Sequence, residues 1–418
     1  MLKIRLIAAV IFITAFIAGC TISPPPPPED AVFLKINYMN QADFNARYGN
    51  FIRSQVPELV FEVIPNDWAK EEDSFADFIK KYDLDIVFMD YNQYVEIASQ
   101  DLLLEVDVKD INGAESIPEQ FLASFRMDDG AYYALPTDYQ TPVIFYNTSV
   151  FNRYNVPYPD DQMTWQEVYE LAARFPIEQG LNPFYGGPAE YVLQNIALTL
   201  GGKIYKEDMT GLRIGEEPWK EAWMLTAKAY ADEVFKRSQI GFEEFVIGRT
   251  AMFYNNAVAI EPMRKKSNSV PVQIVTQPVH PDKPDEFPLF HVNLFGIAAS
   301  TDHPEEAWEA VKWIDELTFQ VPRGNIPARV KEWEHRFRID LSATYKLKLP
   351  VRQDDTIRQA AVELSDNWNA EWQLYHQPLF QRLLQSAIEQ PEMSERIFQQ
   401  FVRESEETWQ KYLSRDKD

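Results

Sequence analysis

Residues 85–89 read Asp85-Ile86-Val87-Phe88-Met89, and this apolar run predicts a strand that is buried on both faces. Residues 32–36 and 60–64 predict two earlier strands, because they are rich in β-branched and aromatic residues. Apolar residues at helical spacing predict a helix over 44–56 and another around 75–79. Strands that alternate with helices in this way predict an α/β fold with a parallel sheet and right-handed crossovers.

The carboxyl ends of these strands are the first candidate binding region. In a sheet of this kind ligands gather beyond the carboxyl ends of the strands, here at residues 38–40, 66–68 and 90–92. The polar candidates in these segments are Asn40, Asp90 and Asn92. Amides and carboxylates can bind ligand hydroxyl groups, but at these positions they can equally cap the helix that follows. Both interpretations remain open.

Length and composition restrict the function. A chain of 418 residues is too long for one ordinary core, which favours two lobes. The formal net charge of −24 repels phosphate backbones and argues against nucleic-acid binding. The five histidines are scattered without metal-ligand spacing, and no Walker loop, dinucleotide fingerprint or nucleophile elbow is present. We therefore expect no metal, no cofactor and no enzyme. A carboxylate pair at glycosidase separation is the one enzymatic alternative that composition leaves open.

The N-terminus predicts export. A basic start and an apolar run over 6–17, too short to span a bilayer, indicate a signal peptide over 1–19. Cys20, the only cysteine, follows Ile17-Ala18-Gly19, and this stretch resembles the lipobox of bacterial lipoproteins. The resemblance implies that Cys20 carries lipid, such as palmitate, and anchors the chain outside the cytoplasm; an unmodified thiol is the alternative. Residues 20–30 then form a tether, because five consecutive prolines must run as an extended polyproline II segment.

Short motifs occur in a fixed order along the rest of the chain. They are Tyr133-Ala134-Leu135-Pro136, Phe145-Tyr146-Asn147, the capping box Thr164-Trp165-Gln166-Glu167, Leu200-Gly201-Gly202, Gly248-Arg249-Thr250-Ala251-Met252, Pro304-Glu305-Glu306-Ala307-Trp308 and Asn325-Ile326-Pro327-Ala328-Arg329. In this order and spacing the chain resembles the extracellular solute-binding proteins of family 1, the maltose-binding-protein-like carbohydrate receptors of ABC importers. The resemblance implies a two-lobed, periplasmic-binding-protein-like (type II) clamshell with a cleft between the lobes.

The resemblance also implies how the chain is divided. The first lobe would hold residues 31–138 and 271–322, and the second would hold 139–270 and the C-terminal helical part, 323–418. The connections between the lobes would lie near 137–141 and 261–271.

Further ligand candidates follow from the same resemblance. They are Asp138 and Gln140 at the first connection, Tyr185, Tyr191 and Asn255 in the second lobe, Asn293 and Arg323 near the lobe ends, and Tyr375. For each, a structural role in the hinge or the core is the alternative. Relatives often carry a sugar-stacking tryptophan where this chain has Val258. Either Trp68, Trp368, Trp372 or Tyr375 replaces it, or the ligand is not a typical maltooligosaccharide.

The expected function is capture of a sugar or oligosaccharide and its delivery to the membrane subunits of an ABC permease. We expect a monomer that is attached to the membrane only through its lipid and does not convert its ligand. A lipid-anchored sensor without a transport role is the second interpretation, and a glycan-active enzyme is the third.

Overall fold

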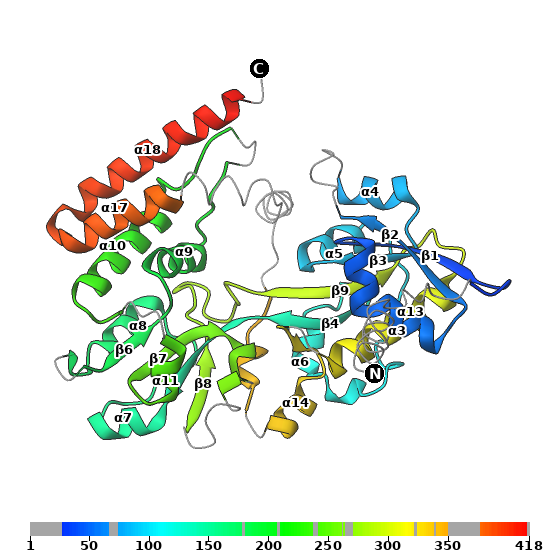
Figure 1. Ribbon diagram of the computed structural model, residues 1–418, viewed down its shortest axis with the longest axis horizontal. Coiled ribbons are helices and arrows are strands. Elements are labelled where there is room, and N and C mark those ends of the chain that lie inside the picture. The colour runs from blue at the N-terminus through cyan, green and yellow to red at the C-terminus, as the bar shows by residue number, and fades with distance from the viewer. Residues whose placement is uncertain are drawn as a thin grey trace, which may run out of the picture.

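The computed structural model describes residues 27–66, 74–177, 180–206, 210–236, 241–260, 262–263, 271–321, 324–337, 340–349 and 377–415. The chain forms two α/β lobes, each built around its own sheet (Figure 1). The first sheet has six strands in the order β10-β4-β9-β3-β1-β2, and the second has four in the order β6-β7-β5-β8.

The first sheet combines segments that are far apart in the sequence. Its strands are β1 (Val32–Tyr38), β2 (Leu59–Pro65), β3 (Ile86–Met89), β4 (Ala134–Gln140), β9 (His291–Ile297) and β10 (Ile326–Pro327). β1 pairs in parallel with β2 and β3, as the sequence predicted. β9 lies between β3 and β4 and pairs antiparallel with both. A strand from the second half of the chain therefore occupies the middle of the first sheet.

Helices cover this sheet and bury apolar side chains against it. They are α2 (Gln41–Phe44), a π-helical turn (Asn45–Gly49), α3 (Asn50–Gln55), α4 (Phe75–Tyr82), α5 (Tyr91–Ala98), α6 (Glu119–Ala123), α13 (Pro304–Gln320) and α14 (Val330–Phe337). Phe44, Tyr48 and Ile52 are buried, whereas Phe51 remains partly exposed. The helix predicted over 44–56 thus begins earlier than expected and contains a π-helical turn.

The second lobe surrounds a smaller sheet. Its strands are β5 (Pro142–Asn147), β6 (Asn182–Tyr185), β7 (Thr250–Asn256) and β8 (Val272–Thr276), and its helices are α7 (Thr148–Tyr154), α8 (Trp165–Ala172), α9 (Ala189–Thr199), α10 (Glu217–Ala231), α11 (Gly241–Val246), α17 (Gln377–Glu389) and α18 (Ser394–Arg415). The predicted capping box at Thr164 is confirmed. The C-terminal helices join this core through Trp223, whose ring lies 5.1 Å from that of Phe401.

The chain passes between the sheets at positions that differ partly from the sequence-based division. It leaves the first sheet after β4 and enters the second at β5, through Thr141. It returns through residues 277–290, between β8 and β9, rather than through 261–271. β8 pairs with β5 and so belongs to the second sheet, not the first. β10 pairs with β4 and so belongs to the first sheet, although residues 326–327 were assigned to the second lobe.

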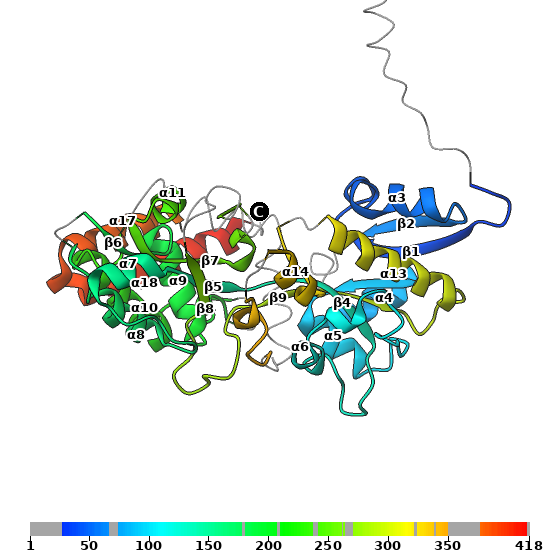
Figure 2. The same cartoon turned by 90° about the horizontal axis from the view of Figure 1, so that it is seen from below.

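Figure 2 shows the same two lobes from below, with β4 and β9 extending toward the second lobe. Among the described residues, no helix combines the length and the apolar character that crossing a membrane requires.

Candidate functional site

Asn40 and Asp90 follow β1 and β3, and each begins a helix. Asn40 Oδ1 accepts from the Asp43 backbone N–H at 2.9 Å, and its Nδ2 donates to Asp43 Oδ2 at 2.6 Å. Asp90 Oδ1 accepts from the backbone N–H groups of Asn92 and Gln93 at 2.8 and 2.9 Å. Both side chains therefore have the capping role that the sequence left open. Asn40 is exposed nevertheless, and Asn92 is buried.

A buried amide fixes this edge of the first sheet. Asn37 Nδ2 donates to the Phe88 carbonyl at 2.7 Å, and Asn37 Oδ1 accepts from the Phe88 N–H at 2.8 Å. The same Nδ2 lies 3.3 Å from Asn66 Oδ1. The carboxyl ends of β1 and β3 and the residue that follows β2 are therefore held together.

Asp138 lies on β4 and is completely buried. A β-bulge between Pro136 and Asp138 shifts the register against β9 and changes which side chains point to each face. Asp138 Oδ1 accepts from Asn293 Nδ2 and, at 2.8 Å, from Asn325 Nδ2. Asp138 Oδ2 accepts from Arg47 at 2.9 Å. The carboxylate thus ties together β4, β9, the start of β10 and the π-helical turn.

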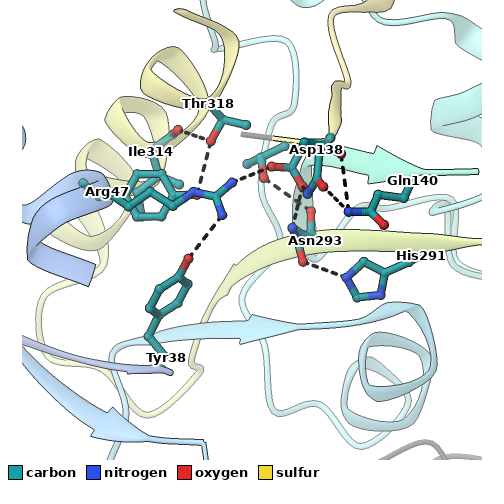
Figure 3. Close-up of polar contacts among 12 residues, drawn as sticks. Tyr38, Arg47, Asp138, Gln140, His291, Asn293, Ile314 and Thr318 are labelled. Carbon is teal, nitrogen blue, oxygen red and sulfur yellow. Dashed lines mark hydrogen bonds and ion pairs between the residues drawn. The ribbon is translucent and has the colours of Figure 1, made fainter. Parts of the chain in front are cut away.

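The negative charge of Asp138 is balanced inside the protein by Arg47. Burial raises the pKa of the Asp138 carboxyl, although Arg47 and the two amides favour its ionised form. Arg47 also lies 3.4 Å from the Tyr38 hydroxyl and 5.1 Å from the centre of the Tyr48 ring. Figure 3 shows the Arg47 side chain between Tyr38 and Asp138. Both carboxylate oxygens of Asp138 accept hydrogen bonds inside the protein. The network therefore positions the strands, and Asp138 presents no free oxygen at the surface.

The accessible end of this network lies further along the same two strands, at Gln140 and His291. Gln140 and His291 face each other across β4 and β9; Gln140 is partly exposed and His291 is exposed. Gln140 Nε2 donates to Asn325 Oδ1, and His291 Nε2 lies 3.1 Å from Asn293 Oδ1. The predicted candidates Asp138, Gln140 and Asn293 are therefore brought together, and only Gln140 is accessible to a solute.

The second lobe presents tyrosines at the carboxyl end of its parallel strands. Tyr185 ends β6 and stacks on Phe253, with ring centres 5.6 Å apart and nearly parallel planes. Tyr191 stands on the first turn of α9 and is 46% exposed. Asn255, near the end of β7, is exposed, and its Oδ1 accepts from the Asn256 N–H. These three candidates share one edge of the second sheet.

The candidates therefore form three groups. One follows β1 and β3, one lies at Gln140 between the lobes, and one follows β6 and β7. In Figure 1, α5 and α9, which begin at the first and third groups, lie on the sides of the two lobes that face each other. The remaining predicted residues lie outside the described part of the chain: Cys20, Trp68, Arg323, Trp368, Trp372 and Tyr375.

The sequence did not single out Arg47, Asn325 or His291 as members of the site. Arg47 lies in a segment that reads as an ordinary amphipathic helix, and its partner Asp138 is 91 positions away. Asn325 had a signal of its own, because it opens a motif that contributes to the family resemblance.

The described residues offer groups that can bind a ligand. Within the described ranges, no three or more His, Cys, Asp or Glu side chains gather as a metal site would require. What the three groups supply is one exposed aromatic face together with amide, carboxylate and imidazole groups. Such a set suits recognition of a small polar solute.

Comparison with known proteins agrees with this geometry. Residues 45–314 match the bacterial extracellular solute-binding protein family. UspC from M. tuberculosis is 13% identical with a TM-score of 0.55, and the match covers 90% of this chain and all of UspC. The sugar-binding protein MalE from Xanthomonas citri is 15% identical with a TM-score of 0.52 over 93% of this chain and 100% of MalE.

A cyclo/maltodextrin-binding protein in complex with maltotetraose is 12% identical with a TM-score of 0.51, over 91% of this chain and 98% of that protein. At these identities the similarity establishes the fold. No curated protein sequence matches the chain.

Proposed function

Because this chain belongs to the bacterial extracellular solute-binding protein family, we propose that it captures a sugar or oligosaccharide between its lobes and delivers it to an ABC permease. In this proposal the chain acts as a monomer, is held at the membrane by lipid on Cys20, and releases its ligand chemically unchanged. Closure of the lobes would couple occupancy to a shape that the permease can recognise.

The observation that carries this proposal is the exposure of Tyr191 at the edge of the second sheet. Its 46% exposure on a helix that faces the other lobe leaves a flat apolar surface available. Sugars present C–H faces to such rings and hydroxyl groups to polar side chains. Asn40, Gln140 and Asn255 are accessible polar groups of the appropriate kind.

At the position where relatives often carry a sugar-stacking tryptophan, this chain has Val258, so another aromatic side chain would have to stack on the sugar. Val258 lies in a short 3-10 turn (Ala257–Ala259) directly after β7, and its backbone N–H is held by Asn256. No aromatic ring is available at Val258, so we assign stacking to Tyr191. MalE and the maltodextrin-binding protein bind sugars, and both share this fold. This supports a carbohydrate as the ligand class.

A panel of neutral oligosaccharides tests the proposal. Purified protein is mixed with each sugar, thermal unfolding is recorded, and the mixture is then analysed for products. We expect at least one sugar to raise the unfolding temperature without being converted. Conversion by a catalytic amount of protein would indicate the enzymatic alternative. No shift with any sugar would favour a sensor or a solute of another class.

A further inference from the structure

The side chain of Gln277 links the connection at Thr141 to the connection over residues 277–290. Gln277 follows β8 directly and is almost completely buried. Its Nε2 donates to the Leu289 carbonyl at 2.7 Å, and its Oε1 accepts from the Leu289 N–H at 3.1 Å. The amide therefore pairs with the backbone as a neighbouring strand would, at a point where β8 has already ended.

The same amide reaches the other connection. Gln277 Nε2 lies 2.9 Å from Thr141 Oγ1, and Thr141 is the residue through which the chain passes from β4 to β5. Thr141 is fully buried, and its carbonyl accepts from the Ala257 N–H at 3.0 Å. Gln277 thus joins the outgoing and the returning connection at the place where both leave the second sheet.

On the first-lobe side, aromatic packing holds the same segments. The rings of Tyr139 and Phe290 stack with centres 5.5 Å apart, and the Tyr139 hydroxyl lies 2.7 Å from Thr344 Oγ1. Tyr139 and Phe290 lie close in sequence to Thr141 and Leu289, and Thr141 Oγ1 itself donates to the Leu289 carbonyl at 3.5 Å. The connections are therefore in contact both at Gln277 and at the Tyr139–Phe290 stack, and the hydrogen bonds of Gln277 oppose independent bending on the second-lobe side.

We propose that Gln277 is a positioning residue that makes the two connections bend as one, and thereby sets which lobe orientations the ligand encounters. It touches no ligand. Without its amide the connections are held together by fewer contacts and bend more independently, so that the two halves of the site are correctly oriented in a smaller fraction of molecules. Apparent affinity falls in proportion to that fraction. This inference deepens the proposed function and rests on it for the affinity effect alone.

The test measures lobe orientation in the absence of ligand. Spin labels at Lys80→Cys on α4 and Arg403→Cys on α18, both exposed, report the distance between the lobes in a Cys20→Ser background. Gln277→Met keeps the length of the side chain and removes its hydrogen bonds. We expect a broader distance distribution than in the parent protein, and about five- to tenfold weaker binding of any sugar identified by the panel.

Asn37→Leu is the matched control, because Asn37 makes the same paired contact to a backbone, Phe88, within one lobe. It should lower stability and leave the distance distribution unchanged. If Gln277→Met does not fold, Thr141→Val removes the acceptor hydroxyl and should broaden the distribution, whereas Thr141→Ser keeps the hydroxyl and should not.

Equal distributions for the parent and Gln277→Met, or for Thr141→Val and Thr141→Ser, would overturn the inference. Since these distances require no ligand, failure of every sugar to bind would contradict the proposed function and leave this result standing.

Discussion

The Arg47 guanidinium lies 2.9 Å from Asp138 Oδ2, so a residue from the turn after β1 neutralises a carboxylate on β4. Asp138 is completely buried, and Arg47 is mostly so. The ionised form of Asp138 depends on its partners, because desolvation opposes ionisation, and the charge of Arg47 together with hydrogen bonds from two amides offsets it.

Arg47→Met should therefore destabilise the first lobe strongly. The substitution leaves Asp138 buried and unpaired, which costs about 3–5 kcal/mol in free energy of unfolding. Urea denaturation measures the loss. The double variant Arg47→Met/Asp138→Asn removes both charges and should recover much of it. A double variant as unstable as the single one would show that the pair is not energetically coupled.

Asp315 predicts a pH dependence of stability. Burial raises the pKa of Asp315 to about 7 from 3.8, although Arg329 Nε lies 3.5 Å from its Oδ2. Between about pH 4 and pH 7 the folded protein keeps a proton on Asp315 that the unfolded chain releases. The stabilisation from protonated Asp315 is therefore present at low pH and is lost as the pH rises toward 7. Ionisation of Asp315 should lower the free energy of unfolding by roughly 3 kcal/mol between pH 5 and pH 8.

Urea denaturation of Asp315→Asn at the two pH values checks this, because the amide cannot titrate. The variant should show a smaller loss between pH 5 and pH 8 than the parent protein. Asp282→Asn, at an exposed carboxylate, serves as the control and should behave like the parent. The same pH dependence in parent and Asp315→Asn would contradict the assignment.

Tyr191→Ala should weaken sugar binding and spare stability. The ring is half exposed, so its removal forfeits a ligand platform and little core packing. We expect affinity to fall about tenfold or more, which is about 1.4 kcal/mol in binding free energy, as measured by calorimetry. Tyr191→Phe should retain binding. Tyr158→Ala, at another exposed tyrosine of the second lobe, is the control; an equal loss there would rule out a specific role for Tyr191.

Gly241 is a position where even one methyl group is too large. A Cβ there would lie 2.2 Å from the Tyr185 ring, so Gly241→Ala must displace Tyr185 from its stack on Phe253. We expect a loss of about 1–3 kcal/mol in free energy of unfolding. Gly211→Ala is a milder comparison, since its Cβ would meet only the ends of the Lys206 and Glu406 side chains. Adding Tyr185→Ala to Gly241→Ala should relieve the strain; no relief would locate it elsewhere.

Cys20→Ser should release the protein from the membrane. Removal of the only thiol eliminates the proposed site of lipid attachment, and a short apolar leader cannot anchor the mature chain. Cell fractionation and the intact mass of the mature protein are the measurements. Membrane association that persists in Cys20→Ser would argue against lipidation at this position.

The sequence predicted the local elements well and their long-range pairing less well. The strands at 32–36, 60–64 and 85–89 carry their own apolar patterns, and they form the predicted parallel sheet. The wrong assignment of β8 has a physical cause. The residues of a five-residue strand favour an extended backbone, whereas pairing with β5 depends on residues 125 or more positions away.

The same limit applies to the site. Asn40 and Asp90 could be located from the sequence, because they follow predicted strands, but capping and ligand binding use the same side chains at the same positions. Only coordinates reveal that the caps are made. Arg47 could not have been paired with Asp138, since nothing near either residue specifies a contact across 91 positions.

The central place of β9 has a consequence for how the protein is made. Because His291–Ile297 fills the gap between β3 and β4, the N-terminal third of a nascent chain cannot complete its sheet. Loop closure over such a separation is slow, which delays native pairing until most of the polypeptide has left the ribosome. This topology would keep the chain unfolded for longer, which is the state that a protein-translocation channel requires.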